Sequence, residues 1–175
     1  MTQNYVQYDL IDGTYRGSVF CSPVQAQEQL NEGVGMIAVS ANPLTTSTVD
    51  GVPTITMNWD VIRNSVATNI DAQAEAFCQS YVTPGETQMI RYSRKEAEAR
   101  AWLTDNNSLT PMLTMEAAAT GVSVSTLADT VIQLADQWTA VMASVESKRI
   151  GAKQQLAGLT NIAEMAAVAN INWSE

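Results

Sequence analysis

The sequence predicts an α+β fold, in which a small N-terminal β-rich module precedes a helical hairpin or bundle with one long C-terminal helix. Two Asp-Gly dipeptides lie between β-branched and aromatic segments in the first third of the chain, a pattern typical of β-hairpins. From about residue 60, apolar residues recur every three or four positions, which is the period of a helix. We therefore expect a β-rich module with one short helix over residues 1–58 and a helical domain over residues 59–175.

Strands are expected on both sides of each Asp-Gly turn. Asp12-Gly13 and Asp50-Gly51 favour tight hairpin turns, because both residue types tolerate a positive φ. A further strand is expected between the two hairpins. The expected strands cover residues 5–11, 14–21, 35–40, 45–49 and 52–59.

One short helix is expected inside this module. Ser22 can cap the free N–H groups of a helix, and Pro23 is tolerated in the first turn because no N–H is needed there. The helix is expected to continue to Leu30 and to stop at Gly33, which can adopt the left-handed conformation of a helix end.

The second part of the chain is expected to be helical throughout. Thr83-Pro84-Gly85 should break the first helix, since Pro cannot donate a backbone hydrogen bond and disfavours helix in the residue before it. Gly121 should end a short Ala-rich helix, and Asn161 with Glu164 has the spacing of a capping box. The expected helices cover about residues 60–81, 86–103, 111–120, 123–158 and 162–168.

The long helix carries an apolar seam that we expect to be its main contact surface. The seam residues, spaced alternately by four and three, are Leu127, Val131, Leu134, Trp138, Val141 and Val145. This spacing is that of the a and d positions of a coiled coil. A continuous helix here would be about 50 Å long, so it should project, bend, or be covered by a partner. Trp138 either plugs a junction with another subunit or fills the core of a monomeric bundle.

A basic run lies on the helix expected over residues 86–103. Arg91, Arg94 and Lys95 are candidates for a docking patch that binds an acidic partner, such as another copy of the chain. The alternative is ion pairing within the helix, for example between Glu96 and Arg100, which contributes a few tenths of a kcal/mol.

Composition argues against several functional classes. Lys and Arg number 9 and Asp and Glu number 18, so the net charge is −9, and we expect no nucleic-acid binding because such a chain repels phosphate. The chain has no histidine, which excludes imidazole catalysis and His–metal sites. We expect no cofactor, metal or membrane segment, and no signal peptide is recognisable. Asp129 and Asp136 share a helix face and are expected to be solvated.

Two cysteines, Cys21 and Cys78, are too few for a zinc cage or a disulfide framework. They are expected to be small buried thiols in a chain made in the cytosol. A disulfide, within or between subunits, remains the alternative if the protein ends outside the cell.

Motifs in the helical part resemble small tail-associated and tail-fibre-associated proteins of tailed bacteriophages. In those proteins a helix breaks at Thr-Pro-Gly and resumes with a Gln-Met…Tyr…Lys…Glu-Ala pattern. A helix starting at Pro, an Ala-rich stretch ending at Thr-Gly and a long Val/Ala/Trp helix follow. The matching residues are Thr83-Pro84-Gly85, Gln88-Met89, Tyr92, Lys95-Glu96-Ala97, Thr110-Pro111, Ala117–Gly121 and Leu127–Arg149. The resemblance covers about residues 60–172, and small β modules similar to the N-terminal portion often precede such helices.

The resemblance implies a structural, non-catalytic component of a bacteriophage virion. It would be a tail, tail-fibre or baseplate adaptor subunit, made in the host cytoplasm, that contacts itself and other tail or fibre proteins. The resemblance supplies no catalytic residues. A tail-fibre assembly chaperone, absent from the mature particle, is the alternative. An enzyme that cuts cell walls is a third alternative, and it would need an acid–base pair in a cleft.

Overall fold

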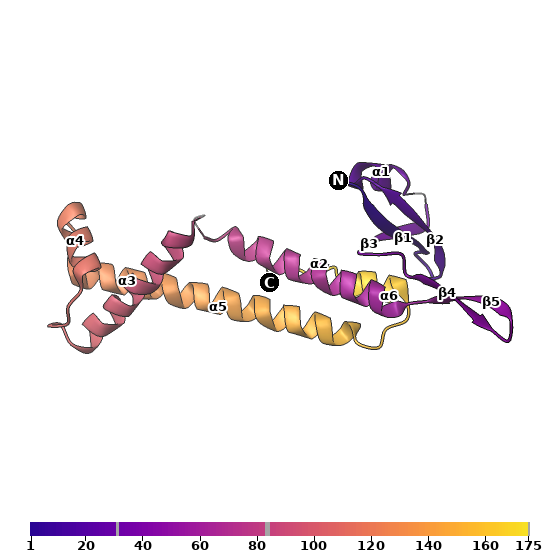
Figure 1. The fold of residues 1–175 in the computed structure, drawn as a ribbon. Helices are drawn as coiled ribbons and strands as arrows, with labels where there is room; N and C mark the ends of the chain where they lie inside the picture. Colours follow the sequence, from indigo (N-terminus) through magenta and orange to yellow (C-terminus); the bar gives the residue numbers. More distant parts are fainter. Residues whose placement is uncertain (31, 83–84, 175) are drawn as a thin grey trace. The chain divides into compact units, whose positions relative to one another are not determined.

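A computed structural model describes residues 1–30, 32–82 and 85–174. It confirms the α+β fold, because small antiparallel sheets precede helices that include the long helix α5 (Val124–Leu156; Figure 1). The change from strands to helices falls between β5 (Val52–Met57) and α2 (Trp59–Gln79).

The first sheet has three antiparallel strands in the order β2-β1-β3, and the helix α1 (Pro23–Glu28) lies between β2 and β3 in the chain. The strands are β1 (Gln3–Asp9), β2 (Tyr15–Cys21) and β3 (Val34–Val39). The first strand ends two residues before the predicted end at Ile11. The reason is local, because the Asp9 carboxylate accepts the Ile11 N–H (2.8 Å) and the Asp9 carbonyl accepts the Gly13 N–H (2.9 Å).

The predicted cap of α1 is confirmed, but the helix is shorter than predicted. The Ser22 hydroxyl accepts the Gln25 N–H (3.3 Å), and the Gln25 side chain accepts the Ser22 N–H (3.0 Å). The helix ends at Glu28 rather than at Leu30. There the bonds tighten to three-residue spacing, since the Leu30 N–H donates to the Gln27 carbonyl (3.3 Å).

The second sheet is the predicted hairpin of β4 (Leu44–Val49) and β5. Asp50 (φ 50°) and Gly51 (φ 77°) both have the positive φ of a type I′ turn, which suits the twist of the flanking strands. The base of the hairpin is fixed, because Pro43 is fully buried and Met57 packs against the core of the first sheet.

The remaining helices follow the predicted breaks closely. They are α3 (Glu86–Thr104), α4 (Pro111–Thr120) and α6 (Ile162–Val168). Gly121 ends α4 with a φ of 74°, and the Asn161 side chain accepts the Glu164 N–H (3.1 Å) at the start of α6. Helix α2 ends at Gln79 instead of residue 81, since the Ser80 and Tyr81 N–H groups make only three-residue bonds. The predicted break at Thr83 and Pro84 lies outside the described residues.

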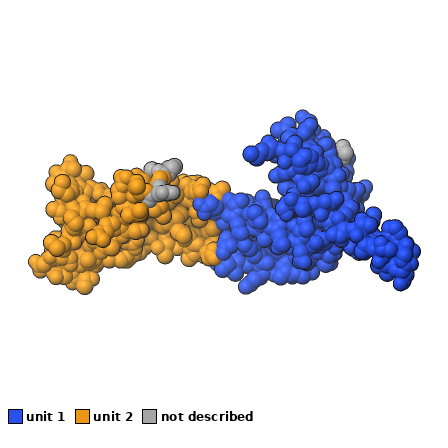
Figure 2. Space-filling view, viewed as in Figure 1, with its two compact units in different colours: residues 1–75, 147–175 blue, residues 76–146 orange. Residues whose placement is uncertain are grey.

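The chain forms two compact units, each held together by contacts among its own residues (Figure 2). Unit 1 comprises residues 1–75 and 147–175, and unit 2 comprises residues 76–146. Residues of the first sheet, α2, the end of α5 and α6 share the core of unit 1. The buried members of that core are Val6, Tyr8, Val39, Ile62, Val66, Ile70, Ala152, Leu156, Ile162 and Met165.

Unit 2 has a small core of its own. Ala99 of α3, Leu113 of α4 and Ala128 of α5 are fully buried together. Trp102, Val124, Leu127, Val131 and Ile132 pack around them. The three helices meet at Ala99, Leu113 and Ala128, and further apolar side chains such as Leu127 and Val131 lie at the edge of this core, where the candidate site lies.

Candidate interaction surface

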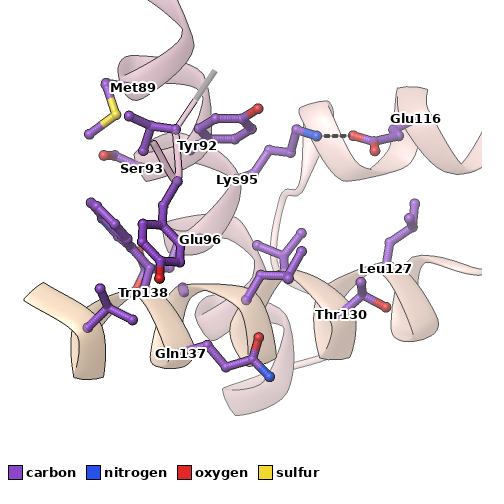
Figure 3. Close-up of a pocket in the computed structure, with 16 residues that line it drawn as sticks. Met89, Tyr92, Ser93, Lys95, Glu96, Glu116, Leu127, Thr130, Gln137 and Trp138 are labelled. Carbon is purple, nitrogen blue, oxygen red and sulfur yellow. Dashed lines mark ion pairs between the residues drawn. The ribbon is translucent and has the colours of Figure 1, made fainter. Parts of the chain in front are cut away.

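A cavity of about 610 Å³ lies in unit 2, with walls from α3, α4 and α5 (Figure 3). The α3 wall carries Met89, Tyr92, Ser93, Lys95 and Glu96. Glu116 comes from α4, and Tyr81 and Val82 come from the segment after α2. The α5 wall carries Leu127, Thr130, Val131, Leu134, Ala135, Gln137, Trp138 and Val141. Most of these side chains are apolar, and the polar ones are uncharged except for Lys95, Glu96 and Glu116.

All of the predicted seam residues except Val145 line this cavity. Val145 is buried, at 4% exposure, and takes no part in the walls. Leu134, in the middle of the seam, is 60% exposed. The seam is therefore buried within the chain at Val145 and exposed to solvent at Leu134. A single copy of the chain thus buries only part of the heptad-spaced residues.

Trp138 makes an aromatic contact at the cavity wall. Its ring lies 6.2 Å from the ring of Tyr81, centroid to centroid, and Tyr81 lies 5.2 Å from Phe77 in an edge-to-face arrangement. Trp138 is half-buried, so one part of it packs within its own unit and another part faces the cavity.

Ion pairs hold the charged groups of the walls. The Lys95 ammonium lies 2.5 Å from the Glu116 carboxylate, as Figure 3 shows. Glu96 pairs with Arg100 (2.9 Å), which confirms the predicted pairing within α3. Arg100 also reaches Asp136 of α5 (2.6 Å), and the hydrogen bonds that it donates, first to Asp136 and then to Glu96, raise the pKa of the Arg100 guanidinium. The Asp136 side chain is 61% exposed, in agreement with its predicted solvation, and it also pairs with Arg100.

The predicted basic patch divides between two environments. Lys95 lies in the cavity wall, but the lining residues include neither Arg91 nor Arg94. The Arg91 guanidinium donates to the Thr87 hydroxyl (3.0 Å). The Arg94 side chain is 72% exposed and lies 3.9 Å from the Glu98 carboxylate. Whether Arg91 and Arg94 dock a partner stays a prediction.

Glu98 was not singled out by its sequence pattern, yet it joins two helices of unit 2. It is only 6% exposed, and its Oε2 accepts the N–H groups of Met112 (2.9 Å) and Leu113 (3.2 Å). These N–H groups belong to the first turn of α4, which has no intrahelical partner for them. The carboxylate also opposes the positive end of the helix dipole. Glu98 precedes Met112 by 14 residues and Leu113 by 15 residues in the sequence, so only the tertiary structure brings its carboxylate to their N–H groups.

The remaining candidate features are metal sites, membrane-spanning helices, the two cysteines and Asp129. Within the described ranges, no group of three or more His, Cys, Asp or Glu residues is arranged to hold a metal ion. In those same ranges no helix has the length and apolar character needed to cross a membrane. Cys21 is a buried thiol packed with Tyr5 and Ala26, and Cys78 is partly buried in α2. Asp129, the neighbour of Asp136 one heptad away, is exposed.

Comparison with known proteins adds no relative to this description. No protein-family model matches the chain, and neither the curated proteins nor the solved structures contain a significant match.

Proposed function

We propose that this chain is a structural, non-catalytic subunit of a bacteriophage virion, in the tail, tail fibre or baseplate, that acts through contacts with other protein chains. The observation that carries the proposal is the apolar cavity of unit 2. It is lined by a heptad-spaced seam whose central residue, Leu134, is 60% exposed. The placement in a virion rests on the resemblance of residues 60–172 to tail-associated proteins.

The chemistry of the walls supports a contact surface. Apolar side chains exposed next to each other favour association, because burying them removes their surface from water. Met89 and Tyr92 on α3 are each 45% exposed and add to the open part of the seam. The charged groups there already have partners, so a second chain could cover the cavity without burying an unpaired charge.

The uncharged flanks of the seam favour another copy as the partner. Thr130, Ala135 and Gln137 lie beside the seam residues and carry no charge. In a chain with a net charge of −9, such a stripe is a place where two copies can meet without like-charge repulsion.

The test compares Leu134→Glu with the matched change Leu103→Glu by light scattering at two concentrations. Both leucines are exposed and helical in unit 2, at 60% and 56%, but only Leu134 lines the cavity. We expect wild type and Leu103→Glu to share an associated mass, and Leu134→Glu to lose at least about tenfold in association. Equal masses for both variants would contradict association through the cavity.

Replacing Val131 and Trp138 with polar residues is also expected to dissolve the association. Both residues pack within their own chain, so helicity must be checked alongside the mass. The virion part of the proposal has a separate test, which is mass spectrometry of purified particles. Detection in particles favours a subunit, whereas detection only in lysate, bound to a fibre protein, favours an assembly chaperone.

A further inference from the structure

The β4–β5 hairpin belongs to unit 1, and its two strands are largely exposed. Its strands read Leu-Thr-Thr-Ser-Thr-Val and Val-Pro-Thr-Ile-Thr-Met, without a charged side chain. Val49, Val52 and Ile55 are more than half exposed. A two-stranded sheet alone is only marginally stable in water, and an open strand edge is a template for another strand.

The register shows which backbone groups point away from the hairpin. Val49 and Val52 flank the two-residue turn and pair directly, and the Asn58 N–H donates to the Pro43 carbonyl (2.7 Å) at the base. Hydrogen-bonded pairs alternate with non-bonded pairs between these two points. The groups of Thr46 and Thr48 on β4 therefore point outward, as do those of Pro53, Ile55 and Met57 on β5.

The two edges differ in what they offer a further strand. On β5, Pro53 has no N–H to donate, and Met57 packs against the core of unit 1. Ile55 is thus the exposed β5 residue whose backbone N–H and carbonyl both point outward. On β4, the outward Leu44 N–H is taken by the Asn42 side chain (3.0 Å). Thr46 and Thr48 are both exposed, and the described residues place no partner on their outward groups.

We infer that β4 pairs with β4 of a second copy, antiparallel about a two-fold axis at Ser47, so that two hairpins form one four-stranded sheet. In this register Thr46 lies opposite Thr48 of the second copy, and each outward N–H meets an outward carbonyl. The pairing is self-complementary, as an isologous interface requires. Asp50 lies opposite Leu44 of the second copy, so the acidic turns do not meet.

A cysteine at the axis tests the register. Ser47 would form a non-hydrogen-bonded pair with Ser47 of the second copy, where the Cα atoms are about 4.5 Å apart and a disulfide can form. Ser47→Cys is made in a Cys21→Ala, Cys78→Ala background. The control is Thr54→Cys, which pairs with Ser47 inside the hairpin but lies on the far strand. We expect Ser47→Cys to cross-link into a two-chain species on mild oxidation and Thr54→Cys to remain a single chain.

Proline substitutions on opposite edges test the strand. Thr46→Pro removes an outward N–H from β4, and Ile55→Pro removes the equivalent N–H from β5. Neither substitution removes a hydrogen bond between the two strands, so we expect both to affect the stability of the hairpin equally. Both substitutions are made in the Leu134→Glu background, so that association through the cavity of unit 2 does not mask their effect. We expect Thr46→Pro to weaken dimer formation at least about tenfold in sedimentation analysis and Ile55→Pro to leave it unchanged. The unfolding midpoints of the two variants control for loss of the fold.

The inference is overturned if Ser47→Cys fails to cross-link, if Thr54→Cys cross-links equally, or if Thr46→Pro in the Leu134→Glu background associates as strongly as Leu134→Glu alone. These results are separable from those for the cavity of unit 2. Leu134→Glu leaves β4 intact, so its Ser47→Cys form should still cross-link even if the proposed function is wrong.

Discussion

Asn161 illustrates how one side chain can serve two parts of unit 1. Its Oδ1 accepts the Glu164 N–H (3.1 Å) and so caps α6. Its Nδ2 donates to the Asp12 carbonyl (2.7 Å) in the first hairpin turn, 149 residues away. Gly13 leaves room for this contact, because a Cβ there would collide with the Asn161 amide. The capping role follows from the local sequence, whereas the bond to the turn exists only in the fold.

Asn161→Ala should lower the free energy of unfolding of unit 1 by about 1–2 kcal/mol, because it removes the cap and the bond to Asp12. Asn161→Asp keeps an acceptor for the Glu164 N–H but cannot donate to the Asp12 carbonyl when ionised. We expect it to be less destabilised than the alanine variant in urea unfolding. An alanine variant as stable as wild type would mean that neither bond contributes.

Asp71 carries an ion-pair network between α2 and α5 in unit 1. Its carboxylate lies 2.7 Å from the Lys153 ammonium and 2.7 Å from the Arg149 guanidinium. The hydrogen bond from Lys153, followed by that from Arg149, lowers the pKa of the Asp71 carboxyl from 3.8. A lowered folded-state pKa means that the ionised pair stabilises the fold above about pH 4, and that this contribution is lost as pH falls through the folded-state pKa.

Asp71→Asn should therefore lower the free energy of unfolding by about 0.5–1 kcal/mol at pH 7, since the side chain is 43% exposed and solvent screens the pair. The difference from wild type should shrink when unfolding is measured below pH 3.8. Asp50→Asn is the matched control, because it removes the same charge from a turn position that suits Asn. A difference between Asp71→Asn and wild type that stays constant with pH would rule out the ion pair as its cause.

Helix α4 shows that a helix start can be completed by a different helix. Pro111 was expected to open it, and it does so, but Thr110 makes no side-chain cap bond. The buried Glu98 of α3 supplies the acceptor instead. This bond fixes α4 against α3 and so helps to position Glu116, whose carboxylate pairs with Lys95 at the cavity.

Glu98→Ala should destabilise unit 2 by about 1–3 kcal/mol, because it leaves the buried N–H group of Leu113 and the partly buried N–H group of Met112 without their acceptor. Hydrogen exchange at these amides is the direct measurement, and their protection should fall more than that of amides later in α4. Glu96→Ala on the same helix removes only the ion pair with Arg100 and should cost about 0.3–0.5 kcal/mol. Unchanged protection of the two amides in Glu98→Ala would refute the cap.

At the scale of the whole molecule, each compact unit carries a surface at which we propose that another copy binds. The cavity of unit 2 joins apolar side chains of helices, whereas the β4 edge of unit 1 joins backbone groups of a strand. A copy that can associate through both surfaces can assemble beyond a dimer, and blocking one surface leaves the other. The solution masses of Leu134→Glu and Thr46→Pro, measured separately, therefore report on each surface by itself.

Most of the local structure could be predicted from the sequence, because its causes are local. Asp50-Gly51 closes the second hairpin, Ser22 caps α1 and Gly121 ends α4, since each acts on backbone groups within a few residues. The seam of α5 could also be predicted, because its period depends only on the pitch of the helix. The ends of strands and helices shifted by two residues where nearby hydrogen bonds competed, as at Asp9.

The sequence by itself determined the order and kind of the elements, the turns and caps between them, and the apolar seam. The tertiary structure decided that β1, α2, the end of α5 and α6 share a core, which joins Val6 to Ile62, Leu156 and Met165. It also decided that Leu134 stays exposed while Val145 is buried. These outcomes depend on contacts between residues far apart in the chain. The periodicity and spacing of apolar residues within one segment do not specify where another segment packs against it.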